Sequence, residues 1–209
     1  MSGHGITPIS EILGFFQGAG KRVISFAGFA ELGYEDPAIV EKVAAEVLDG
    51  RNPNDVLVNS GTLLREGGQE GIARIYALAK QRGIATSGIH PGIALDFAST
   101  HTVSPFVDHV FFVDDATWGG LYQGAPSPTL QTILDVTDEL VVVGGGKHAA
   151  EELLAFSHRG KSVRYFPARM NRGATDEWRQ RSGIDAGALD GAAFEVWKRL
   201  SAAEHESRG

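Results

Sequence analysis

The segment LVVVGGGKHAAEELL, residues 140–154, decides the fold that this sequence predicts. Residues 140–143 are all apolar, which is typical of a strand that is buried on both faces of a parallel sheet. The three glycines at 144–146 allow the backbone to turn sharply and to approach a ligand closely. Residues 147–158 then predict a helix. The first N–H groups of a helix have no internal partner and its dipole is positive there, so this segment predicts an anion-binding turn.

Other glycine motifs do not fit this turn. A Walker A loop has Ser or Thr after its Gly-Lys pair, whereas His148 follows Lys147 here. The dinucleotide fingerprint GxGxxG is also absent from the turn. Glycines also occur between a strand and a helix simply because the connection is tight, and this structural interpretation stays open beside the ligand-binding one.

Apolar strands alternate with amphipathic helices along most of the chain. We expect strands at 21–27, 55–58, 84–89, 108–113, 140–143 and 161–166. We expect helices at 8–17, 37–48, 65–82, 127–136 and 147–158, with loops at 93–106 and 116–128 and one or two closing helices from Trp178 to Leu200. Such alternation predicts an α/β fold, a Rossmann-like doubly wound parallel sheet in three α/β/α layers. With no linker in sight, residues 1–209 are expected to form one nucleotide-binding domain with a C-terminal helical extension.

Five of the six predicted strands end in a turn at the same edge of the predicted sheet. These ends lie at Gly28, at residues 60–62, at 90–91, at 114–115 and at 144–146. Because ligands of doubly wound sheets bind beyond the carboxyl ends of the strands, the convergence of these turns predicts a phosphate or nucleotide pocket.

Composition narrows the classes of protein. The formal net charge is -7, which argues against a nucleic-acid binder that relies on a broad basic surface. There is no cysteine, and no apolar run approaches the length that spans a membrane. No signal peptide is recognisable at the N-terminus. We therefore expect a cytoplasmic protein that has neither a membrane nor a nucleic acid as a partner.

The pattern resembles the SLOG superfamily of Rossmann-like nucleotide-binding proteins, which includes the LOG-type phosphoribohydrolases and the nucleotide-sensing domain of TRPM channels. LOG-type enzymes carry the motif PGGxGTxxE. Gly145 and Gly146 match its glycine pair and Glu152 matches its acid, whereas Gly144, His148 and Ala149 stand where the motif has proline, glycine and threonine. The run from Asn59 to Thr62 resembles the earlier glycine-rich nucleotide loop of these proteins. The resemblance implies a homodimer whose ligand is a nucleotide or a nucleotide derivative.

Together these observations define a candidate site. Glu152 is the candidate catalytic residue, because a carboxylate stabilises the oxocarbenium-like transition state of glycosidic cleavage. The candidate nucleotide-binding residues are Gly28, Phe29, Ser60, Gly61, Thr62, Arg65, Gly144, Gly145, Gly146, Lys147 and His148. The base is expected near Gly28 and Phe29 or near the loop that carries Trp118. No cofactor is expected, and no metal, since the spacing of His90, His109, Asp114 and Asp115 fits no standard metal motif.

Two functions from different classes stay open. One is hydrolysis of the N-glycosidic bond of a nucleotide. The other is a sensor or binding module without catalysis, which the departures at His148 and Ala149 favour. A structural protein that has lost its pocket is a third class. Trp118 and Tyr122 either stack on a base or pin their loop to the core.

Overall fold

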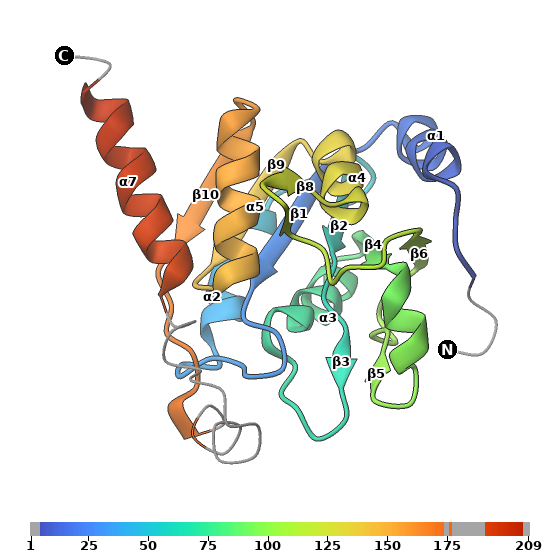
Figure 1. Cartoon of the computed structure of the whole chain (residues 1–209), viewed down its shortest axis with the longest axis horizontal. Helices are drawn as coiled ribbons and strands as arrows, with labels where there is room; N and C mark the ends of the chain where they lie inside the picture. The colour runs from blue at the N-terminus through green and yellow to red at the C-terminus, as the bar shows by residue number, and fades with distance from the viewer. Residues whose placement is uncertain (1–4, 174–175, 177–190, 207–209) are drawn as a thin grey trace.

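A six-stranded parallel sheet organises the computed structural model, which describes residues 5–173, 176 and 191–206 (Figure 1). The sheet order is β10-β9-β1-β2-β4-β6, and every neighbouring pair is parallel. The strands are β1 (Arg22–Gly28), β2 (Val56–Ser60), β4 (Ala85–Pro91), β6 (His109–Val113), β9 (Glu139–Val143) and β10 (Ser162–Phe166). The predicted Rossmann-like α/β fold is confirmed.

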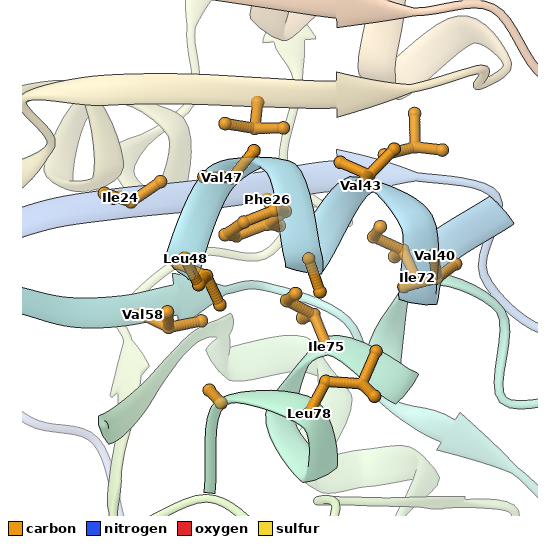
Figure 2. Packing of buried hydrophobic residues seen from close by; sticks show 14 of the residues in the cluster. Ile24, Phe26, Val40, Val43, Val47, Leu48, Val58, Ile72, Ile75 and Leu78 are labelled. Carbon is orange, nitrogen blue, oxygen red and sulfur yellow. The ribbon is translucent and has the colours of Figure 1, made fainter. Parts of the chain in front are cut away.

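Helices cover both faces of this sheet. The helices are α1 (Ile9–Ala19), α2 (Ile39–Leu48), α3 (Arg74–Gln81), α4 (Pro128–Val136), α5 (Lys147–His158) and α7 (Ala192–Glu206). Alternate residues of a strand face opposite sides, so β1 sends Ile24 and Phe26 toward α2 and α3, and Val23 and Ala27 toward α1, α4 and α5. Figure 2 shows the first of these cores, where residues of α2 and α3 pack over β1 and β2. Because both faces are buried in this way, the sheet is the middle layer of three.

The helix predicted at 65–82 is wrong over its first half. Leu64–Arg65 form a short strand, β3, which pairs antiparallel with β5 (His101–Thr102), and helix α3 begins only at Arg74 after the 3-10 turn η1 (Gly71–Ala73). Two N–H groups of the backbone between them donate to the loop after β1. Gln69 N–H donates to Glu31 O at 2.8 Å, and Ile72 N–H donates to Phe29 O at 2.7 Å.

The two predicted loops contain short regular elements. The 93–106 region begins in a 3-10 helix, η2 (Gly92–Phe97), and then forms β5. The 116–128 region carries an antiparallel hairpin of β7 (Leu121–Tyr122) and β8 (Ala125–Pro126). Strand β2 continues past the predicted Val58 to Ser60, because Asn59 finds hydrogen-bond partners inside the core in Ser25 and Ser87, each at 3.0 Å.

The C-terminal helix α7 begins inside the predicted segment 178–200 and ends at Glu206, beyond the predicted Leu200. Helix α7 packs against α5, while Trp178 lies outside the described residues. Among the helices of the described chain, none has the length and apolarity needed to cross a membrane.

Candidate functional site

A cavity of about 350 Å³ opens at the carboxyl edge of the sheet, on the side of α4 and α5. The ends of β1, β2 and β4 form its floor, the first turns of α4 and α5 form its walls, and the segment before β7 lies at its mouth. Five predicted site residues line it together: Gly28, Gly61, Thr62, His148 and Glu152. The structure thus brings together residues from three separate predicted turns.

The cavity lies beside the point where the strand order reverses. From β1 the chain proceeds outward through β2, β4 and β6, and then returns to place β9 on the other side of β1. Tyr34 joins the two strand ends at this point, because its hydroxyl accepts from Phe29 N–H at 3.2 Å and donates to Val143 O at 3.0 Å. Burial raises the pKa of this phenol, so the hydroxyl stays protonated as a donor. A doubly wound sheet binds its ligands next to such a reversal.

The triple-glycine turn supports the cavity from behind and does not line it. Gly144 N–H donates to Phe166 O at 2.8 Å, and Gly145 O accepts from Ala193 N–H at 3.2 Å. Gly145 has a φ of 114°, and a side chain there would collide with Ala149. Close packing therefore accounts for Gly144 and Gly145, in agreement with the structural interpretation of the turn.

The first turn of α5 faces the cavity. Helix α5 has Gly146 as its N-cap, no side-chain cap and no acidic residue in its first turn. The N–H groups of such a turn have no intrahelical acceptor and carry the positive end of the helix dipole. His148 and Ala149 of this turn line the cavity, whereas Lys147 is 70% exposed and lies 3.7 Å from Glu151. This turn is therefore the strongest anion-attracting element at the cavity.

Glu152 lies one turn further along α5 with its carboxyl group in the cavity lining. Within the described chain this carboxyl has no hydrogen bond and no ion pair. Its burial raises its pKa to about 7, and the neighbouring Glu151 adds to the rise. Glu151 itself is engaged, since it accepts from Leu121 N–H at 3.0 Å. Glu152 is thus a partly protonated acid near neutral pH.

Three other predicted residues lie outside the cavity. Phe29 is only 4% exposed and packs against the ring of Tyr34 in the core. Ser60 is buried, and its hydroxyl donates to Thr62 Oγ1 at 3.2 Å. Arg65 lies at the rim, with its guanidinium 3.8 Å from Glu31, whose side chain does line the cavity.

Sequence reasoning missed the contribution of α4. Thr129 lies in the first turn of this helix, is 3% exposed and lines the cavity, yet its hydroxyl has no hydrogen-bond partner in the described structure. Buried hydroxyls are normally bonded, so this one is an exception within the described structure. Nothing in the sequence distinguishes Thr129 from an ordinary first-turn residue. His101, which also lines the cavity, falls in a segment whose residues show no period.

Asp115 fixes the segment that closes the cavity. Its carboxylate accepts from Thr117 N–H at 2.8 Å and from Thr129 N–H at 3.0 Å. Burial opposes ionisation of Asp115, but these hydrogen bonds outweigh burial and hold the pKa of the carboxyl below its usual value. Across the residues that the structure describes, no group of three or more His, Asp or Glu side chains is placed to hold a metal.

Comparisons with known proteins add a likeness in structure. No protein-family model and no curated protein matches this sequence. Among solved structures, the chain is similar to the Moco carrier protein of Chlamydomonas rheinhardtii, with a TM-score of 0.45 and 18% sequence identity. The match covers 87% of this chain and 99% of the carrier protein. The Rossmann-like assignment rests on the sheet order and the two packed faces described above.

Proposed function

We propose that this protein is a SLOG-type nucleotide-binding protein and that the cavity between α4 and α5 receives a nucleoside monophosphate. The observation that carries this proposal is the placement of two features one helical turn apart on α5. The uncapped first turn supplies N–H groups for a phosphate, and Glu152 supplies an unpartnered carboxyl group. Four residues of helix span about 6 Å, which suits the separation of the phosphate and the anomeric carbon in a ribose 5-phosphate.

The charges around the cavity favour a single phosphate. Among the described residues that line it, the ionisable side chains are Glu31, His101, His148 and Glu152, without a lysine or an arginine. A triphosphate would bring several charges into a space that offers few cations to balance them. One phosphate can be held by the N–H groups of a helix N-terminus.

If the protein is an enzyme, we propose hydrolysis of the N-glycosidic bond. Water adds to the anomeric carbon, the bond from that carbon to the base nitrogen breaks, and the base leaves with a proton. Glu152 in its ionised form stabilises the positive charge that develops on the sugar and takes a proton from the attacking water, and the release of this proton balances the one that the leaving base takes up. A pKa near 7 suits such a group, because both protonation states are populated at neutral pH.

Binding without turnover is the second candidate function. The motif positions of glycine and threonine are filled here by His148 and Ala149, and Ala149 contributes only a methyl group to the cavity wall. A hydroxyl at that position would be available to orient water or phosphate, whereas a methyl group is not. This observation favours a sensor or carrier of the nucleotide.

One experiment separates these functions. The protein is titrated with ribose 5-phosphate and with nucleoside mono- and triphosphates by calorimetry, and the mixtures are assayed for free base by chromatography. Binding of monophosphates with base release that falls about 100-fold or more in Glu152→Gln supports the enzyme. Binding without release supports the sensor. The proposal fails if neither ribose 5-phosphate nor any monophosphate binds. The matched control is Glu41→Gln, since Glu41 is 48% exposed on α2, pairs with Arg74 on the neighbouring α3, and does not line the cavity.

A further inference from the structure

Three aromatic rings cluster at the mouth of the cavity. Trp118 lies 5.1 Å from Phe97 and 5.4 Å from His101, measured between ring centroids, and the rings are tilted by 50° and 44°. Trp118 and His101 both line the cavity. Neither neighbour lies parallel to the indole, so both contacts are tilted and not stacked.

This cluster is separate from the two hydrophobic cores. Trp118 and Phe97 are each 42% exposed, and neither belongs to a core cluster of the described residues. A tryptophan that pinned its loop to the core would be buried in that core. Here the exposed indole instead continues the wall of the cavity outward.

Hydrogen bonds already hold the segment on both sides of Trp118. Thr117 donates to Asp115 from its backbone at 2.8 Å and from its hydroxyl at 2.7 Å. Beyond Trp118, Leu121 N–H donates to Glu151 at 3.0 Å, which ties the hairpin to α5. The ring is therefore presented by a fixed backbone, and a fixed platform loses little entropy when a ligand stacks on it.

We infer that Trp118, with Phe97 and His101 beside it, is the stacking platform for a planar heterocyclic base. This inference rests on the proposed function and makes it more specific: the ligand is recognised through an aromatic ring as well as through a phosphate. Stacking of a base on an aromatic side chain strengthens binding by about 10-fold or more. A nucleoside monophosphate therefore binds at least about 10-fold more tightly than ribose 5-phosphate, which has no ring to stack.

The test compares ligands with and without a base in three variants. Trp118→Leu removes the ring, Trp118→Phe retains a smaller one, and Tyr122→Leu is the control. Tyr122 is 57% exposed in the hairpin that follows Trp118 and does not line the cavity. Calorimetry measures the affinity for a nucleoside monophosphate, for its nucleoside and for ribose 5-phosphate, and circular dichroism checks that each variant is folded.

The platform predicts a selective loss. Trp118→Leu lowers the affinity for the monophosphate and for the nucleoside about 10-fold and leaves the affinity for ribose 5-phosphate unchanged. Trp118→Phe restores part of the lost affinity, and Tyr122→Leu has no effect on any of the three. An equal loss for all three ligands, or no loss for any, overturns the platform. If the nucleoside binds through Trp118 and no phosphate compound binds more tightly than it, the platform stands and the proposed phosphate site fails. If ribose 5-phosphate binds as tightly as the monophosphate, the phosphate site stands and the platform fails.

Discussion

The two ends of the parallel sheet differ in whether a carboxyl group there has partners within the protein. At the amino end of β9, Glu139 is 4% exposed and lies 2.8 Å from Arg164 and 3.0 Å from Arg22, with Arg51 at 3.6 Å. At the carboxyl edge, Glu152 faces the cavity without any hydrogen bond or ion pair in the described chain. The carboxylate of Glu139 is therefore paired within the protein, whereas the carboxyl of Glu152 is not.

Buried hydroxyls repeat this contrast. Ser25 on β1 and Ser87 on β4 bond to Asn59 on the strand between them, and Ser25 also lies 2.6 Å from the hydroxyl of Thr137. Thr129, which is buried just as deeply in the cavity wall, has no partner. An unpaired buried polar group costs stability, and among the described residues Nη2 of Arg164, beside Glu139, also lacks a hydrogen-bond partner.

The largest expected effect comes from removing the charge of Glu139 at the amino end of β9. Glu139→Gln leaves three arginines around a neutral amide, and we expect the free energy of unfolding to fall by about 3 kcal/mol. Urea unfolding followed by circular dichroism measures this change. The control is Glu41→Gln, which removes an exposed pair with Arg74 and is expected to cost under about 0.5 kcal/mol. Equal effects in the two variants would contradict the contrast between the ends of the sheet.

Replacing Glu152 at the carboxyl edge is expected to raise the free energy of unfolding, the opposite of the effect at Glu139. The pKa of Glu152 is about 7 in the folded chain, above its ordinary value of 4.5, so the folded state binds more protons than the unfolded state between these pH values. Stability therefore falls as the pH rises through this window and stays lower above pH 7. Glu152→Gln removes this penalty and is expected to stabilise the protein at pH 8 by roughly 2 kcal/mol, with little effect at pH 4.

Urea unfolding at both pH values checks this prediction. A difference between Glu152→Gln and the parent chain that is the same at pH 4 and pH 8 would show that the carboxyl of Glu152 titrates normally. The same two proteins, titrated with a nucleoside monophosphate, report whether the carboxyl that destabilises the fold also serves the ligand.

A smaller difference in stability is expected between replacing an unpartnered and a hydrogen-bonded buried hydroxyl of α4. Thr129→Val removes the unpartnered hydroxyl at constant volume, so we expect stability to be unchanged or to rise by about 1 kcal/mol. Thr132→Val is the matched control, because the Thr132 hydroxyl donates to Pro128 O at 2.8 Å and its loss should cost about 1 kcal/mol. Thermal unfolding of both variants measures the difference. If Thr129→Val destabilises as much as Thr132→Val, the Thr129 hydroxyl has a structural partner after all.

The sequence predicted the sheet well because its strongest signals are local. The four apolar residues and the glycines after them mark the end of β9 and the start of α5, and α5 spans the predicted residues 147–158. The helix predicted at 65–82 was wrong because long-range hydrogen bonds from Gln69 and Ile72 to the loop after β1 replace helical ones. No pattern of spacing reveals such bonds.

The candidate site was predictable where it follows the strand ends, and less so elsewhere. Gly28, Gly61 and Thr62 line the cavity because parallel strands end at one edge. Thr129 enters from the side on α4, and its lack of a partner is visible only once its surroundings are packed. Conversely, Gly144 and Gly145 carried the strongest sequence signal but are explained by close packing behind the cavity.

Replacing Arg65 is expected to change stability least, and it tests whether the ligand site extends beyond the cavity lining. Its guanidinium is 41% exposed at the rim and 3.8 Å from Glu31, so Arg65→Ala should change the free energy of unfolding by less than about 0.5 kcal/mol. As a screened charge near the mouth, it should strengthen monophosphate binding about threefold at low salt and have no effect at high salt. Titrations at two salt concentrations, with Arg74→Ala as the control, measure this. A loss of about 100-fold that persists at high salt would instead mean that Arg65 leaves Glu31 and clamps the phosphate directly, extending the ligand site beyond the cavity lining.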